Sequence, residues 1–326
     1  MANYIVTGGS GFIGHNVVRQ LEALGHKCHV IDIIENYSFI PKDELKYLHH
    51  ERNKRMRAIV HHINITDRLK METLFSALHY EIDGVIHLAS FPRQKMVERF
   101  PHQAAEVMGT ALIDLLELTV RYHIPKFVYI SSSMVYGDFF KAAREDDRCN
   151  PIGQYAIMKL MGEQLVEDYS RRKLIEHVIV RPSAVYGEWD VEDRVVSKFI
   201  LAALRGDTLE VHGPNERLDF THVDDCAAGI VLATTTPSAV NQTINISRGR
   251  ARTLLEAAET AIEVVGKGTI NKVERDKSYP RRDQLALGRA SFCFNYEPKI
   301  DIYDGFTRYA EWFKISPYWG KKLGNV

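Results

Sequence analysis

The chain has no excess of charge and no apolar run of membrane-spanning length. Its 326 residues contain 42 Lys and Arg against 42 Asp and Glu, so we expect no general attraction to nucleic acid or to an anionic membrane. The start of the chain lacks the charged and apolar regions of a signal peptide. With 45% hydrophobic residues, the sequence predicts a folded cytoplasmic protein that holds a small ligand through local groups.

Cysteine is also scarce. Cys28, Cys149, Cys226 and Cys293 are widely scattered, and they form neither a CxxC pair nor a metal-ligand spacing with nearby histidines. We interpret them as reduced residues and predict no metal site. Internal repeats and low-complexity stretches are absent as well.

Short apolar runs alternate with helical patterns in the first half of the chain. This alternation is typical of a parallel sheet with helices on both faces. The predicted strands are residues 4–7, 28–33, 58–63, 84–88, 126–131 and 177–181. Right-handed crossovers then give an α/β fold with a doubly wound parallel sheet.

The pattern changes beyond residue 181, where continuous apolar strands become rarer and Gly and Pro interrupt the chain more often. We predict a dinucleotide-binding domain over residues 1–180 and a smaller α/β substrate-binding domain over 181–326. Residues 243–247 are expected to return to the first domain as a further strand.

A glycine turn lies between the first predicted strand and the first predicted helix. Gly8, Gly11 and Gly14 are spaced three apart, and they permit a tight turn with close approach of the backbone to a pyrophosphate. We expect this turn, with Phe12 and Ile13, to bind a dinucleotide, as in a Rossmann fold.

Asp32 ends the second predicted strand and is expected to accept hydrogen bonds from the adenosine ribose, which favours NAD over NADP. The alternative is a strand-end carboxylate without a ligand. Weaker candidates for cofactor binding follow the third and fourth strands: Asn64 and Ile65 beside the adenine, and Leu88, Ala89 and Ser90 beside the ribose and phosphates.

Tyr155 and Lys159 lie four residues apart in a helical stretch, so their side chains share one face. We expect the ammonium to lower the pKa of the phenol from its usual value of about 10. Such a tyrosine can remove a hydroxyl proton as a general base while a carbon gives up hydride to a nicotinamide ring.

Several motifs extend over nearly the whole chain: residues 7–14, 87–90, 131–137, 181–187, 220–225 and 296–299, together with Tyr155 and Lys159. This set resembles the extended short-chain dehydrogenase/reductase family, in particular its sugar-nucleotide epimerases and dehydratases. The resemblance implies that Ser132, or else its neighbour Ser133, hydrogen-bonds the sugar hydroxyl that becomes a ketone. It also implies that Lys159 binds the nicotinamide ribose.

The positions after Ser132 bear on the reaction. Family dehydratases have an acidic pair there and related decarboxylases a glutamate, whereas this chain has Ser133 and Met134. The resemblance therefore implies an NAD-dependent nucleotide-sugar epimerase that acts through a transient ketone, with carbon 4 as the expected centre. Two alternatives stay open: an NAD-dependent sugar dehydrogenase or reductase that releases reduced cofactor, and a non-catalytic dinucleotide-binding regulator.

Some substrate-side positions depart from the family pattern. Ala184 replaces an Asn that contacts the diphosphate, Leu218 replaces an Arg, and Glu106 replaces a helix Asn. The remaining candidates for an anionic substrate are arginines: Arg217, Arg281 and Arg282 for the diphosphate, and Arg93 for an anionic sugar. Surface positions without a ligand are the alternative for each.

Two further expectations concern surfaces. The basic segment 46–57 is interpreted as a solvated helix, with a nucleotide-phosphate contact as the alternative. The resemblance implies a homodimer in which the helix over 107–122 and the helix of Tyr155 form a four-helix contact.

Overall fold

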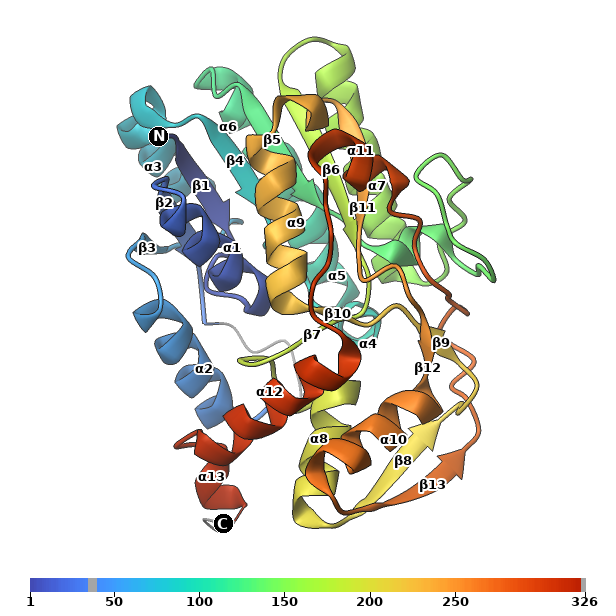
Figure 1. The fold of residues 1–326 in the computed structure, drawn as a ribbon. Helices are drawn as coiled ribbons and strands as arrows, with labels where there is room; N and C mark the ends of the chain where they lie inside the picture. The colour runs from blue at the N-terminus through green and yellow to red at the C-terminus, as the bar shows by residue number, and fades with distance from the viewer. Residues whose placement is uncertain (35–39, 324–326) are drawn as a thin grey trace.

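The computed structural model describes residues 1–34 and 40–323. Within them, a parallel sheet of seven strands has the order β11-β6-β5-β4-β1-β2-β3 (Figure 1). The strands are β1 Asn3–Thr7, β2 Lys27–Asp32, β3 Ile59–His62, β4 Gly84–His87, β5 Lys126–Ile130, β6 Glu176–Pro182 and β11 Gln242–Ile246. The predicted α/β fold with a doubly wound sheet is confirmed, and the ends of the predicted strands differ by only one residue.

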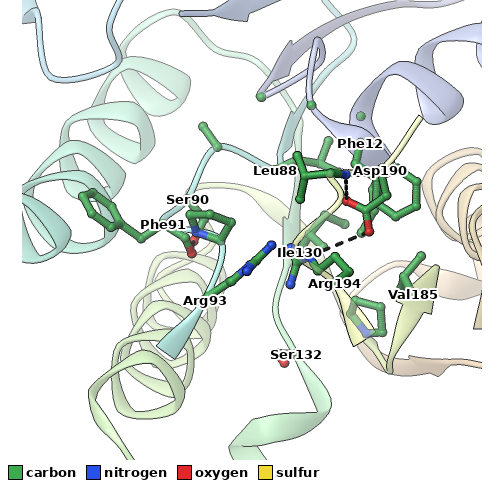
Figure 2. Close-up of a pocket in the computed structure, with 18 of the residues that line it drawn as sticks. Phe12, Leu88, Ser90, Phe91, Arg93, Ile130, Ser132, Val185, Asp190 and Arg194 are labelled. Carbon is green, nitrogen blue, oxygen red and sulfur yellow. Dashed lines mark hydrogen bonds and ion pairs between the residues drawn. The ribbon is translucent and has the colours of Figure 1, made fainter. Parts of the chain in front are cut away.

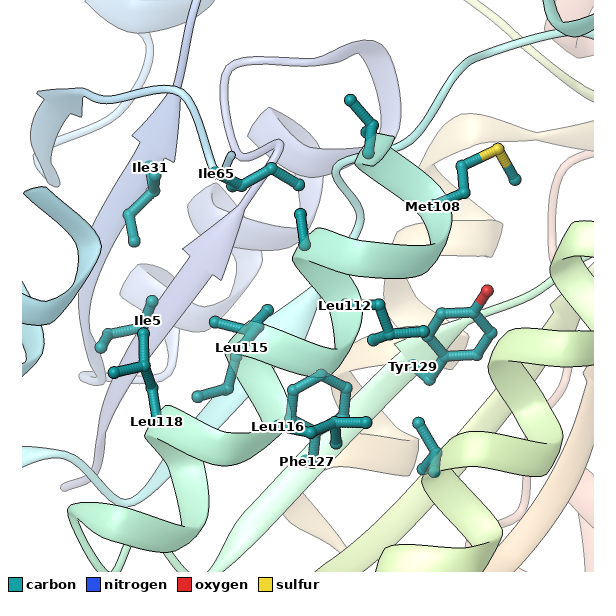
Figure 3. Packing of buried hydrophobic residues seen from close by; sticks show 14 of the residues in the cluster. Ile5, Ile31, Ile65, Met108, Leu112, Leu115, Leu116, Leu118, Phe127 and Tyr129 are labelled. Atoms are coloured by element: carbon teal, nitrogen blue, oxygen red, sulfur yellow. The ribbon is translucent and has the colours of Figure 1, made fainter. Parts of the chain in front are cut away.

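Successive side chains of a strand point to opposite faces of the sheet, and helices cover and bury both faces. Ile5 of β1 packs on the same side as Ile31 and Phe127, against Leu112 and Leu115 of a covering helix (Figure 3). The helices of this side include α3 Arg68–Leu78, α4 Gln94–Arg99, α5 Pro101–Ala105, α6 Ala111–Arg121 and α7 Gln154–Arg171. The other side is covered by α1 Phe12–Ala23, α9 Val223–Thr235 and α11 Gly288–Phe294.

A smaller unit lies below the sheet in the view of Figure 1. It contains α8 Val195–Arg205, α10 Leu254–Val265, α12 Ile302–Ile315, α13 Trp319–Lys322 and the parallel pair of β8 Thr208–His212 with β13 Thr269–Val273. Two short pairs connect it to the rest: β7 Val185–Tyr186 with β10 Thr221–His222, and β9 Arg217–Leu218 with β12 Arg252–Thr253. Its core is rich in aromatic side chains, including Tyr309, Phe313 and Trp319.

The chain passes between the two units more than once. After β6 it enters the smaller unit, and it then returns to the sheet through α9 and β11, where Gln242–Ile246 pairs with Val178–Pro182. It enters the smaller unit again with α10. A division of the chain at residues 180 and 181 stays a prediction.

The basic segment lies on helix α2, Lys42–Lys54, which has a wet face and a buried face. Its buried residues Glu44, Leu48 and Arg52 are four apart, and Leu48 packs into the core of the smaller unit. The interpretation of a solvated helix is therefore wrong for this inner face, because tertiary packing covers it. No helix in the described residues has both the length and the apolarity needed to span a membrane.

Candidate active site

The glycine turn is held tightly against the end of β4. Gly8 has φ +72°, and a Cβ on it would lie 2.6 Å from the backbone nitrogen of Ala89. A Cβ on Gly14 would lie 2.2 Å from the carbonyl oxygen of Gly8. The turn therefore needs glycine at both positions, and it presents the amino end of α1 to a cleft, where backbone N–H groups favour an anion.

The carboxylate of Asp32 lies at the carboxyl end of β2, beside this turn. Its Oδ2 accepts a hydrogen bond from the Ser10 N–H at 2.7 Å, and its Oδ1 accepts one from the Ile33 N–H at 2.7 Å. Burial raises the pKa of Asp32 to about 6, against the effect of these hydrogen bonds and of Arg52. A half-buried carboxylate at this strand end is suited to accept hydrogen bonds from ribose hydroxyls.

One cleft of about 640 Å³ connects the glycine turn with the helix of Tyr155. All of the predicted cofactor-binding residues lie on its wall: Gly8, Gly11, Phe12, Ile13, Gly14, Asp32, Asn64, Ile65, Leu88, Ala89, Ser90, Tyr155 and Lys159. They come from the carboxyl ends of several parallel strands, where open α/β sheets bind ligands.

Tyr155 and Lys159 both reach this cleft from α7, but the electrostatics differ from the sequence prediction. The Nζ of Lys159 donates to the Ile130 carbonyl at 2.8 Å and lies 6.0 Å from the centre of the Tyr155 ring. Burial lowers the pKa of Lys159 to about 7. Burial also raises the pKa of Tyr155, partly offset by Arg194, by a hydrogen bond with Ser132 and by Arg282. The prediction that Lys159 makes the phenol acidic is therefore wrong.

The two serines after β5 point in different directions. Ser132 lies on the cleft wall and forms a side-chain hydrogen bond with Tyr155. Its Oγ also accepts a hydrogen bond from the Met134 N–H at 3.2 Å. Ser133 is buried, and its Oγ donates to the Oγ of Ser183 at 3.1 Å. The geometry therefore supports Ser132 as the catalytic hydroxyl and gives no support to Ser133 as a catalytic or substrate-binding residue.

A buried ion pair holds α7 against the sheet near these groups. Arg181 of β6 and Glu163 of α7 approach to 2.6 Å, and Glu163 also accepts a hydrogen bond from Ser131. Glu163 lies four residues after Lys159, so this contact fixes the face of α7 that presents Tyr155 and Lys159 to the cleft.

The wall of the cleft beyond the predicted cofactor site contains three arginines. Arg93 and Arg194 lie on its wall near Asp190 (Figure 2). Arg282 and Asp193 belong to the same wall. Arg93 and Arg282 were predicted from the sequence, whereas Arg194 was not, because it lies directly before α8 at the end of an irregular loop without periodicity.

Arg217 lies outside the cleft. Its Nε is 3.2 Å from Asp283, and its Nη2 donates to the Ala251 carbonyl at 3.2 Å. Arg281 is also off the cleft wall and lies 3.7 Å from Glu216. The predicted contact of Arg217 with a substrate has no support from this geometry.

Arg52 of α2 is a further cleft residue that sequence reasoning missed as an individual position. It is buried, and its Nε donates to the Trp189 carbonyl at 3.0 Å while its Nη1 lies 3.5 Å from the Ser10 carbonyl. Trp189 belongs to the loop before α8, and Ser10 to the glycine turn. Arg52 therefore connects the cofactor end of the cleft to the loop that contains Asp190 and Arg194.

The glycine turn, the strand-end carboxylate and the Tyr155/Lys159 pair on one cleft define the chain as a Rossmann-fold enzyme that uses a dinucleotide. Residues 4–247 match the NAD dependent epimerase/dehydratase family. The chain belongs to this family, and NAD is its cofactor. In the described residues, no cluster of His, Cys, Asp or Glu side chains is arranged to hold a metal ion.

Similar proteins include enzymes named for more than one reaction. The chain is 28% identical to an uncharacterized UDP-glucose epimerase of Bacillus subtilis, over 93% of this chain and 95% of that protein. It is 30% identical to UDP-glucuronic acid decarboxylase 6 of Arabidopsis thaliana, over 95% and 88% respectively. The structure of UDP-glucuronic acid 4-epimerase from Bacillus cereus with UDP-glucuronic acid and NAD matches with a TM-score of 0.84 and 27% identity, covering 95% of this chain and 98% of that chain.

Proposed function

We propose that the protein is an NAD-dependent nucleotide-sugar epimerase that inverts carbon 4 through a transient 4-keto sugar. The observation behind this proposal is the chemistry around the Tyr155 hydroxyl. Tyr155 forms a hydrogen bond with the side chain of Ser132. The next two residues, Ser133 and Met134, cannot supply the strong acid or base that elimination of water needs. The hydroxyl groups of Tyr155 and Ser132 are therefore available for the oxidation and reduction of the sugar, and positions 133 and 134 offer no catalyst for elimination.

Each of the chain's own groups has a part in this scheme. Tyr155 takes the proton from the sugar hydroxyl, and Ser132 hydrogen-bonds the same oxygen and orients it. Bound NAD supplies the acceptor and donor of hydride. Lys159, whose Nζ donates to the Ile130 carbonyl, would bind the nicotinamide ribose. Closure of the cleft around the sugar must exclude water while the ketone exists.

The substrate side of the proposal has support from the relatives and from Arg282. UDP-sugar epimerases are among the similar proteins, including the Bacillus cereus 4-epimerase. Arg282 lies on the cleft wall, and its Nε has no hydrogen-bond partner in the described residues. We assign it to the diphosphate of the nucleotide, which favours charge-assisted hydrogen bonds.

The test begins with the ligand that purified protein retains, identified by mass spectrometry. Incubation with UDP-sugars without added cofactor, followed by NMR, then measures inversion at carbon 4, with Tyr155→Phe as the inactive control. When the reaction runs in deuterated water, we expect no incorporation of deuterium at the carbon atoms of the sugar. Stoichiometric release of NADH would instead indicate a dehydrogenase, and NAD binding without hydride exchange in wild type and variant alike would indicate a regulator.

A homodimer is also part of the proposal. Ile113 of α6 and Ile157 and Met161 of α7 are apolar side chains with exposed fractions of 41%, 53% and 36% on neighbouring helices. Exposed apolar residues gathered on one surface are typical of an interface. The cytoplasmic location stays a prediction from the sequence.

A further inference from the structure

The sugar end of the cleft has more positive charge than one diphosphate contact requires. Arg93 follows β4, and Arg194 directly precedes α8; Figure 2 shows the Arg93 side chain pointing toward Arg194, which is paired with Asp190. With Arg282 assigned to the diphosphate, two guanidinium groups are left for the sugar. A neutral hexose needs no cation there, because its hydroxyls hydrogen-bond equally well to neutral groups.

Neither guanidinium is fully paired within the described residues. Arg93 binds Asp193 through Nη1, but its buried Nη2 has no hydrogen-bond partner. The Nε of Arg194 is 3.7 Å from Asp190 Oδ2, and neither atom has a hydrogen-bond partner. Buried donors without partners are costly, so an acceptor from a ligand would satisfy both groups at once.

The two aspartates do not neutralise this pair of arginines. Asp193 is shared with Lys198, whose Nζ lies 2.7 Å from its Oδ1. Asp190 is buried and also faces Arg52. Each carboxylate that faces Arg93 or Arg194 is thus shared with a further cation, and the free Nη2 of Arg93 and Nε of Arg194 stay without a hydrogen-bond partner in the described residues.

Arg93 and Arg194 share the cleft wall with Tyr155 and Ser132. Among the groups that lower the pKa of Tyr155, Arg194 has the largest effect, which places its charge near the phenol. The pKa of Arg93 is lowered by burial and next by Arg194, so the two guanidinium groups are close neighbours. An acidic group next to the reacting carbon would therefore meet both arginines.

We infer that the substrate is a nucleotide-linked uronic acid, whose carboxylate lies between Arg93 and Arg194 next to the reacting carbon; this inference rests on the function proposed above. A planar carboxylate matches the fork of a guanidinium, so its oxygens can accept hydrogen bonds from the free Nη2 of Arg93 and the free Nε of Arg194. Both arginines would then act as specificity residues that select an acidic sugar over a neutral one.

A carboxylate in this place has a chemical consequence. A ketone at carbon 4 makes the sugar a β-keto acid, in which the bond between carbons 5 and 6 can break to release CO₂ and leave its electron pair as an enolate. The enolate then takes a proton at carbon 5. Two arginines that hold the carboxylate would keep this bond from aligning with the ketone, so we expect the acid to survive turnover.

The test compares the binding of UDP-glucuronic acid and UDP-glucose to the NAD-loaded protein by calorimetry. We expect wild type to prefer the acidic sugar by about 10- to 100-fold, the range for charge-assisted hydrogen bonds. Arg93→Gln and Arg194→Gln should each remove most of this preference while changing UDP-glucose binding by less than about threefold. Arg93→Lys keeps the charge without the fork and should retain part of the preference.

The controls separate this inference from the proposed function. Arg205→Gln, on the exposed end of the same helix as Arg194, should keep the preference, and thermal unfolding checks that each variant folds. Equal binding of both sugars by wild type would overturn the inference, as would a preference unchanged in both Gln variants. A strong preference without inversion at carbon 4, or with release of CO₂, supports the acidic substrate and overturns the proposed epimerase.

Discussion

The pKa of Asp32 predicts that NAD binding depends on pH. Asp32 accepts two backbone hydrogen bonds, and its free lone pairs face the cleft. Only the ionised carboxylate can accept hydrogen bonds from both ribose hydroxyls through these lone pairs. Protonation should therefore weaken NAD binding, and Asp32→Asn should remove this pH dependence.

The magnitude follows from the pKa of about 6. At pH 5 about one tenth of the carboxyl is ionised, so NAD should bind about tenfold more weakly than at pH 7. Asp32→Asn should weaken binding by about 10- to 100-fold at pH 7, because it removes charge-assisted hydrogen bonds. The raised pKa also means that the folded protein holds this proton more tightly than the unfolded chain. The contribution of Asp32 to stability is therefore full below pH 4 and declines by at most about 3 kcal/mol as pH rises through 6.

The assay is calorimetric titration of NAD-stripped protein between pH 5 and pH 7.5. The variant Asp207→Asn, at an exposed position, controls for a general effect of charge on NAD binding. The variant His62→Gln removes another side chain that affects the pKa of Asp32, so it shows whether the pH dependence comes from Asp32 itself. An affinity of wild type that stays constant over this range would refute the reasoning. So would an Asp32→Asn variant with the same pH profile as wild type.

The remaining predictions concern four positions. Ser132→Ala should lower kcat by about 10- to 100-fold, whereas Ser133→Ala should change it by less than about threefold, since only Ser132 faces the cleft; steady-state kinetics of the pair decides between them. Arg52→Gln should lower the free energy of unfolding by about 2–4 kcal/mol, because the Trp189 carbonyl loses its charged donor; denaturant titration measures this, and an unchanged midpoint would contradict it. Ile157→Glu should convert the proposed dimer to a monomer in light scattering, and a monomeric wild type would contradict the interface.

The sheet and the cofactor end of the cleft were predictable because they depend on local patterns. Gly8, Asp32 and Tyr155 follow strands or lie on a helix with clear periodicity, and all three lie on one cleft wall. Arg194 was not predictable, because the loop before it has no period and its path depends on packing against the smaller unit. Arg52 was hidden in a run of charges, although its spacing of four from Leu48 is a helical signal.

The direction of the serines and the acidity of the phenol were beyond sequence reasoning for another reason. A turn of 3₁₀ helix after β5 rotates Ser133 toward Ser183 and leaves Ser132 on the cleft. Burial outweighs the nearby charges at Tyr155, and the strongest of those charges comes from a residue far away in the sequence. Both effects arise from three-dimensional contacts that spacing along the chain does not encode.

The repeated passage of the chain between its units limits how this enzyme can be recombined with its relatives. A chimera joined once after β6 would replace α9 and β11, so the edge of the sheet would come from a different parent than the strand it pairs with. Exchange of sugar specificity therefore calls for at least two grafted segments, one on each side of the returning strand. The contacts of Arg52 with Ser10 and Trp189 would have to be matched in the same step.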